Sequence, residues 1–325
     1  MRPLMRGGGG RRRAPAWVEA VARRPRAAAL AGALFISFSG IFFRFSDTTP
    51  ATATVFRCLY ALPFLGLIAL DERRRLGPFE RRGHYLAVLA GLLFGADLLA
   101  WQHAVDLVGA GLATVVANLQ VVVVAALAWL LLRERPSWGV VLAIPVMLGG
   151  VALIGGLVGR GAYGADPRLG LLFGLLSAVA YSGYLLLTRQ GNLGGLRPAT
   201  MLFDSSAAAV LAAAVVGGLL GDLNPVPSWP AHGWLLAVAL TSQVAGYLLI
   251  SASLPRLPAA LTSAILLAQP VATVFEGGVL LGERPSALQL AGVGLVIAGL
   301  LAASMVGRPA SDPRATAVRE PAESG

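Results

Sequence analysis

The chain of 325 residues is 56% hydrophobic and only 13% charged, whereas about a quarter of the residues in soluble domains are charged. This composition excludes an ordinary soluble domain and indicates a polytopic membrane protein. The formal net charge of +10 comes from 26 basic residues, all of them Arg, which lie mostly in loops and tails, so no nucleic-acid partner is expected. The single cysteine, Cys58, lies in an apolar stretch, which excludes a disulfide or a cysteine-based metal site.

Residues 1–26 contain a Gly run and eight Arg, and we expect a disordered basic cytoplasmic tail there. Ten apolar stretches follow, each close to the roughly 20 residues that a helix needs to span a bilayer. Residues 307–325 are polar and predict a second cytoplasmic tail. The predicted membrane helices cover 27–45, 51–70, 85–104, 111–132, 139–158, 170–188, 201–220, 232–252, 259–281 and 289–306.

The distribution of Arg predicts the orientation of these helices. With both termini inside, 21 of the 26 Arg fall in cytoplasmic segments. Basic residues concentrate on the cytoplasmic side of membrane proteins. The prediction is therefore a multi-pass protein of the bacterial plasma (inner) membrane, N-in and C-in.

One phrase occurs twice in the chain. LLRERPS at 131–137 returns as LLGERPS at 280–286, an offset of 149 residues. The same offset, without a gap, brings Gln120 onto Gln269. A register shared by several such matches indicates an internal duplication.

The duplication predicts two repeats, at 27–158 and 170–306, with five helices each. Because five is odd, the second copy must enter the membrane upside down. The fold class predicted is therefore an all-α polytopic membrane protein of ten transmembrane helices in two inverted five-helix repeats. RERPS at 133–137 is then cytoplasmic and GERPS at 282–286 external. Inverted repeats are typical of secondary transporters, which bind substrate near the midplane.

Polar residues inside a bilayer are costly and usually face a cavity or the interior of the helix bundle. They recur at helical spacing in five of the stretches, the first, third, sixth, eighth and ninth, which predicts a shared cavity. In the fourth stretch, Asn118 and Gln120 lie on different faces, so we expect at most one of them to face the cavity. Arg57 of the second stretch is a further candidate. The striped helices contribute the candidate binding or coupling residues Arg44, Asp97, Trp101, Tyr181, Tyr184, Gln243, Tyr247, Gln269 and Glu276.

The charged candidates allow two interpretations each. Asp97 is either a proton-coupling carboxylate or partner of a substrate ammonium, or one half of a structural ion pair with Arg44 or Arg57. The two Arg side chains either reach the outer surface or bind a substrate carboxylate. Glu276, near an outer helix end, is expected to pair with an Arg or to stand exposed at an entrance.

The uncharged candidates are also open to two interpretations. Gln120 and Gln269 either bind substrate from both repeats or tie neighbouring helices together. The Tyr and Trp side chains either line a cavity for an apolar or cationic solute or only pack. We interpret the two ERPS segments as helix stops, since Pro restricts the residue before it and Ser can cap a helix.

Three segments carry a family resemblance: QPVATVFEGGVLLGERPS at 269–286, its degenerate partner QVVVVAALAWLLLRERPS at 120–137, and FRCLYALPFL at 56–65. Over residues 30–306 the chain resembles the EamA-type branch of the drug/metabolite transporter superfamily. The resemblance implies a ten-helix 5+5 fold with a central cavity lined by the first, third, fourth, sixth, eighth and ninth helices. It also implies small substrates such as amino acids, or drugs.

One position departs from the repeat. Val121 stands where the second copy has Pro270, so a helix break at this level is not implied for the first copy.

The predicted function is a secondary transporter of a small amino acid-like or drug-like metabolite, working by alternating access. We favour export, with proton coupling left open; an uptake permease is the alternative within transport. A membrane enzyme, sensor or scaffold on the same fold is the alternative from another class. No nucleotide-binding loop, metal cluster or catalytic triad appears, so neither enzymatic activity nor a cofactor is expected. The partners expected are a small-molecule substrate and the lipid bilayer; a homodimer stays open.

Overall fold

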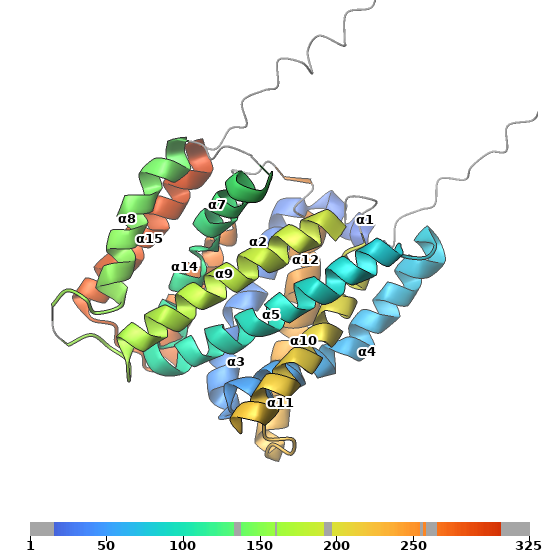
Figure 1. Cartoon of the computed structure of the whole chain (residues 1–325), viewed down its shortest axis with the longest axis horizontal. Coiled ribbons are helices and arrows are strands. Elements are labelled where there is room, and N and C mark those ends of the chain that lie inside the picture. The colour runs from blue at the N-terminus through green and yellow to red at the C-terminus, as the bar shows by residue number, and fades with distance from the viewer. Residues whose placement is uncertain are drawn as a thin grey trace, which may run out of the picture.

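The computed structural model describes residues 16–132, 138–159, 161–191, 197–253, 256–257 and 265–306. The predicted cytoplasmic RERPS segment at 133–137 lies outside them. Helices supply the regular structure of the described residues (Figure 1). They are α1 (Ala16–Arg23), α2 (Pro25–Ser37), α3 (Ser39–Ser46), α4 (Pro50–Leu76), α5 (Arg81–Val108), α6 (Ala110–Ala117), α7 (Gln120–Leu132), α8 (Trp138–Ile154), α9 (Pro167–Gly191), α10 (Pro198–Leu220), α11 (Trp229–Val238), the π-helix η1 (Ala239–Gly246), α12 (Tyr247–Ser253), α14 (Ala268–Leu280) and α15 (Ala287–Val306).

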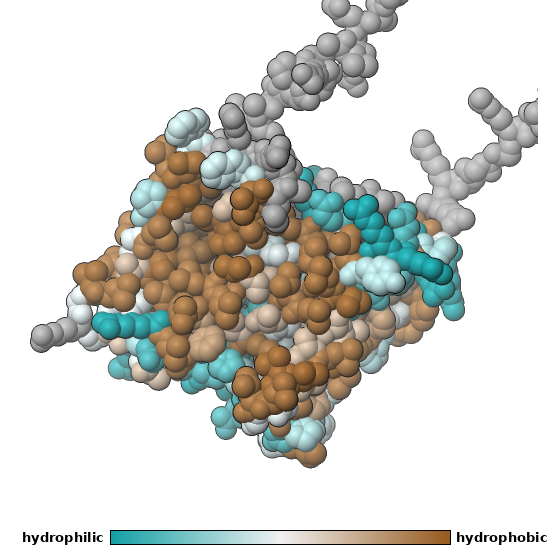
Figure 2. Space-filling view, in the orientation of Figure 1, coloured by the Kyte–Doolittle hydropathy of each residue, from teal (hydrophilic) through white to brown (hydrophobic). Residues whose placement is uncertain are grey.

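Membrane-spanning length is clear for six of these helical stretches. Within the described residues, Pro25–Ser46, Pro50–Leu76, Arg81–Val108, Pro167–Gly191, Pro198–Leu220 and Trp229–Ser253 are long and apolar enough to cross a bilayer. Shorter apolar helices at Ala110–Val124, Trp138–Ile154 and Ala287–Ala303 fall where further spans are predicted. Apolar side chains cover much of the face shown in Figure 2, with polar groups gathered toward its ends. The chain is a multi-pass, all-α membrane protein.

Helix α1 corrects one prediction. Residues 16–23 are helical, although the sequence predicts a disordered tail over 1–26. Its apolar side chains explain the difference, since Val18 and Val21 are buried and Trp17 packs against a hydrophobic cluster. Burial of one apolar face stabilises a short helix that would be marginal in isolation.

Four of the stretches predicted as continuous helices are interrupted within the described residues. The ninth is interrupted at Leu267, before α14. The first breaks at Phe38, between α2 and α3, and the eighth contains the π-helix η1. The fourth breaks between α6 and α7, even though Val121 replaces the Pro of the second copy. There the carbonyl of Thr114 accepts both the backbone N–H of Asn118 (3.1 Å) and its side-chain Nδ2 (2.8 Å). The next backbone bonds, from Leu119 to Val116 and from Val121 to Asn118, reach back only three residues.

Helix packing follows the duplication. Two pairs of helices at equivalent places in the two halves pack on each other: α4 on α10, and α8 on α15 at one edge of the bundle (Figure 1). Helix α6 of the fourth predicted stretch packs on α14 of the ninth. Other contacts also join the two halves. Helix α5 of the first half packs on α9, and α2 and α3 pack on α11, η1 and α12 of the second.

Two carboxylates connect the halves reciprocally. Glu72, near the end of α4, accepts hydrogen bonds from the backbone N–H groups of Ala199 (3.1 Å) and Thr200 (2.9 Å) in the first turn of α10. Asp222, just after α10, accepts one from Ala51 at the start of α4 at 3.0 Å. Each helix thus satisfies free donors at the N-terminus of the other.

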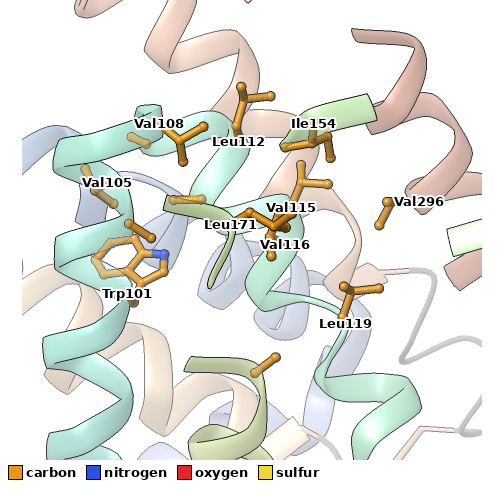
Figure 3. Close-up of a cluster of buried hydrophobic side chains, with 14 of the residues drawn as sticks. Trp101, Val105, Val108, Leu112, Val115, Val116, Leu119, Ile154, Leu171 and Val296 are labelled. Atoms are coloured by element: carbon orange, nitrogen blue, oxygen red, sulfur yellow. The ribbon is translucent and has the colours of Figure 1, made fainter. Parts of the chain in front are cut away.

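A hydrophobic cluster fills the space beside α6 (Figure 3). Leu112, Val115 and Val116 of α6 are fully buried, and the cluster extends from α5 to α8 and α15. Such close packing holds α6 firmly up to the break at residues 118–119. Polar side chains around this break face the central cavity.

Candidate functional site

A cavity of about 210 Å³ lies in the middle of the bundle, lined by helices of both halves. It is smaller than most ligand pockets, which range from roughly 300 to 1,000 Å³. Its wall carries both charged and aromatic side chains. Of the predicted site residues, the structure brings together eight at this cavity: Arg57, Asp97, Trp101, Asn118, Gln120, Tyr181, Tyr247 and Gln269.

Asp97 is the acidic group of the cavity. It comes from the middle of α5 and is only 6% exposed. Its Oδ1 accepts a hydrogen bond from Ser177 Oγ of α9 at 2.6 Å. Among the described residues it forms no ion pair with Arg44 or Arg57, so the structural ion pair considered from the sequence is absent. Asp97 therefore reaches the cavity without a direct ion pair, and Arg57 lines the same cavity.

Arg57 is the basic group, and it is 2% exposed. One Nη donates to Ser39 Oγ at 3.0 Å, beside the break between α2 and α3. The other donates to Ser242 Oγ and Gln243 Oε1 of η1, both at 3.2 Å. These neutral partners orient the guanidinium, which forms no direct ion pair among the described residues. The alternative that Arg57 reaches the outer surface is wrong.

Asn118 and Gln120 both line the cavity, which contradicts the prediction that at most one would. On one continuous helix, residues 118 and 120 would face different directions. The chain instead breaks at residues 118–119, which turns the two side chains to the same side. Gln120 and its repeat mate Gln269 also meet at this one cavity.

Three polar atoms of the cavity wall are buried without a hydrogen-bond partner among the described residues: Arg57 Nε, Thr114 Oγ1 and Gln120 Oε1. Such atoms are uncommon in folded proteins, because an unpaired buried polar group costs about 1–3 kcal/mol. All three atoms belong to residues that line this cavity, so its wall holds polar groups that the described residues leave unsatisfied.

Aromatic rings form another part of the wall. Trp101, Tyr181 and Tyr247 line the cavity. Behind them, the rings of Phe94 and Tyr184 stack with centroids 4.6 Å apart, and Tyr181 stacks on Tyr184 at 5.4 Å. The inner layer holds the outer rings in place, which favours a preformed cavity.

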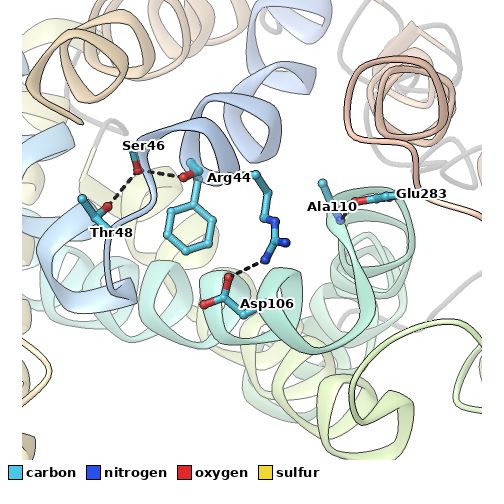
Figure 4. A network of polar contacts seen from close by, with 7 residues as sticks. Arg44, Ser46, Thr48, Asp106, Ala110 and Glu283 are labelled. Atoms are coloured by element: carbon cyan, nitrogen blue, oxygen red, sulfur yellow. Dashed lines mark hydrogen bonds and ion pairs between the residues drawn. The ribbon is translucent and has the colours of Figure 1, made fainter. Parts of the chain in front are cut away.

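Four predicted residues do not line the cavity. Tyr184 is packed behind Tyr181, and Gln243 is fully buried, where it accepts from Arg57 and donates to Ser206 Oγ at 3.1 Å. Arg44 forms an exposed ion pair with Asp106 at 3.1 Å (Figure 4).

Glu276 is the fourth of them, and it is neither exposed nor paired with an Arg. Only 7% exposed, it accepts a hydrogen bond from Ser37 Oγ at 2.7 Å, at the end of α2. Its second oxygen, Oε2, is buried without a partner among the described residues.

Ser39 and Thr114 line the cavity although the sequence did not single them out. Hydroxyl side chains are a weak signal in a membrane helix, since they can bond to their own backbone. For both residues the missing information was a nearby helix break, at Phe38 for Ser39 and at residues 118–119 for Thr114.

These features define a class: a helical multi-pass membrane protein whose two halves enclose a polar cavity. The model of the EamA-like transporter family matches residues 26–156 and 168–305. The chain belongs to this family. It is a membrane transporter, not an enzyme, and the two matches suggest a repeat.

Two further similarities agree with this assignment. Over 139 residues the chain is 30% identical to the uncharacterized transporter YcbK of Bacillus subtilis (strain 168). The matched segment covers 41% of this chain and 45% of that protein. The match therefore spans less than half of the curated relative. A protein of known crystal structure shares the fold, with a TM-score of 0.59 and 16% identity, covering 89% of this chain and 99% of that one.

Proposed function

We propose that the protein exports a small amino acid-like solute through the plasma membrane by alternating access, with Asp97 as a proton-coupling residue. In this proposal the two repeats are inverted in the membrane, N-in and C-in, and the cavity between them opens alternately to the two sides. The observation that carries it is a carboxylate and a guanidinium that line one small cavity without forming an ion pair with each other.

The chemistry of the wall favours a zwitterion. A solute ammonium would pair with Asp97 and a solute carboxylate with Arg57, and each pairing removes the cost of a buried charge. Gln120 and Thr114 would complete the hydrogen bonds. A proton on Asp97 would compete with the ammonium, which couples solute release on one side to proton uptake there.

The test is flux of radiolabelled solutes into inverted membrane vesicles under imposed pH gradients, using a panel of amino acids. Asp97→Asn should lower the flux at least about tenfold, a loss of about 1.4 kcal/mol in transition-state terms, and remove its dependence on the gradient. Asp106→Asn is the matched control on the same helix and should keep both. Gradient-dependent flux in Asp97→Asn would refute proton coupling through this residue. Flux only in right-side-out vesicles would favour uptake.

A drug-like cation is the second candidate, because Trp101, Tyr181 and Tyr247 offer aromatic faces beside Asp97. Arg57→Gln separates the two classes. Amino acid flux should be lost in this variant, whereas flux of a hydrophobic monocation, counted only above that of vesicles without the protein, should persist. Size-exclusion chromatography must show that Arg57→Gln remains monodisperse, since Arg57 holds three hydrogen bonds.

A further inference from the structure

A second pocket, of about 380 Å³, lies away from the central cavity, where the end of α4 meets the starts of α5 and α10. Its inner wall is apolar, with Leu70 of α4, Phe79 of the connecting segment and Phe203 of α10. Gly66 widens it, because a Cβ there would stand 3.2 Å from the Phe203 ring. The pocket thus has space and surface for a hydrocarbon chain.

The rim of this pocket is basic. Arg197 is fixed in place: it donates to the carbonyls of Gly77 (2.6 Å) and Leu76 (2.7 Å), with its guanidinium over the Phe79 ring at 5.9 Å. Arg73 is exposed and lines the pocket, with no side-chain hydrogen bond or ion pair among the described residues. One cation is therefore preorganised and a second is free to bind.

The acidic groups nearby are already occupied. Asp204, which lines the pocket, contacts His84 Nδ1 at 2.6 Å, and Asp71 pairs with Arg75 at 2.8 Å. Glu72 is buried beneath the rim, where it accepts from the first turn of α10. Arg73 is thus left as the available charge. Figure 2 shows hydrophilic side chains gathered at this end, over the junction of α4 and α5.

The outer face of α4 continues the apolar wall into the surrounding medium. Phe64, Leu67 and Leu70 are 43%, 69% and 50% exposed. In a helix that crosses the membrane, such residues contact lipid. A molecule with a negatively charged group at the rim and a hydrocarbon chain along this face would match both the basic and the apolar part of the site.

We propose that this pocket binds one anionic phospholipid, with its phosphate on Arg73 and Arg197 and an acyl chain against Phe203 and Leu70. Basic pockets between membrane helices bind anionic headgroups, and Arg matches the geometry of a phosphate. The site is independent of the central cavity and of the transported solute.

The test is native mass spectrometry of the purified full chain, titrated with phosphatidylglycerol or with phosphatidylcholine of the same acyl composition. We expect phosphatidylglycerol to bind at least fivefold more tightly. Arg73→Ala should remove most of this preference. Arg74→Ala, which deletes an exposed charge one residue away that does not line the pocket, should keep it.

Three results would overturn the proposal. Equal losses in Arg73→Ala and Arg74→Ala would mean that only the summed charge attracts lipid. Equal binding of the two lipids would mean that the rim does not select a headgroup. Displacement of phosphatidylglycerol by millimolar inorganic phosphate alone would mean that the site takes a free anion.

Discussion

Glu283 illustrates how a residue acquires a role from a distant segment. It belongs to the repeated ERPS phrase, which the sequence suggests is only a helix stop. In the structure its carboxylate accepts from the backbone N–H groups of Ala110 (2.6 Å) and Gly111 (3.2 Å) at the start of α6 (Figure 4). The residue therefore connects the two halves of the molecule. It also satisfies two backbone donors that the first helical turn leaves free.

Removal of this contact should destabilise the protein measurably. Glu283→Ala leaves the N–H groups of Ala110 and Gly111 buried and unpaired, at a cost of about 1–3 kcal/mol. Glu283→Gln keeps an acceptor oxygen and should cost less than half as much. Thermal unfolding in detergent measures both variants. Equal losses in Ala and Gln would show that the backbone donors do not depend on this side chain.

The difference in stability between wild type and Glu283→Gln should depend on pH. Burial raises the pKa of Glu283 above its ordinary value, although the bonds from Ala110 and Gly111 oppose the rise. A carboxyl group with a raised pKa binds its proton more tightly in the folded state, so its stability contribution is full below roughly pH 4.3 and is lost as pH rises through the folded pKa. Wild type should therefore gain stability relative to Glu283→Gln as pH falls from neutral.

At the scale of elements, helix α5 depends on small residues to approach α10. A Cβ on Gly91 would lie 2.6 Å from Ala208 Cβ and 2.8 Å from Ser205 Cα, and the second of these atoms belongs to the backbone. The helices cannot give way there without moving apart. Close approach at Gly is a common means of packing membrane helices, where the hydrophobic effect offers no drive.

Gly91→Ala should therefore destabilise the protein by about 1–3 kcal/mol through overpacking. Gly218→Ala in α10 is the matched control, because nothing lies within 4 Å of its Cβ position. That change should be neutral or stabilise by up to about 1 kcal/mol, since Ala favours a helix over Gly. Melting temperatures of the two variants test this prediction. A smaller loss of stability at Gly91 than at Gly218 would contradict close packing of α5 on α10 at Gly91.

For the whole molecule, the inverted topology is the proposal with the widest consequences. The reciprocal caps by Glu72 and Asp222 support it, because each helix of the pair closes the start of its counterpart. So does the exchange of packing partners between the halves. Both are what a two-fold relation between repeats produces.

Cysteine labelling in intact cells tests the orientation directly. Cys58 is fully buried, so Cys58→Ala provides the background. We expect a membrane-impermeant maleimide to label Val226→Cys, at a position that is 79% exposed after α10, from outside. Arg82→Cys, at the start of α5, should react only after permeabilisation. The reverse pattern, or labelling of both in intact cells, would exclude an N-in arrangement.

Local properties explain what could be predicted for the site. Asp97 stands out because it is a charged residue in an apolar stretch, and burying a lone charge is costly. Gln120 and Gln269 could be paired because the duplication keeps one register. Asn118 and Gln120 together could not, because their shared orientation depends on the break between α6 and α7, which no Pro marks in the sequence.

The sequence by itself determined the membrane character, the positions of the apolar segments and the register of the duplication, because hydropathy and repetition are properties of short stretches of chain. Only the tertiary structure decided which polar groups meet. Arg57 faces the cavity, and Glu276 turns to Ser37, because contacts between residues far apart in sequence decide where each polar side chain is satisfied. The ERPS phrase combines both kinds of information. Its spacing indicated the repeat, and its Glu283 caps the N-terminus of a helix more than 170 residues away.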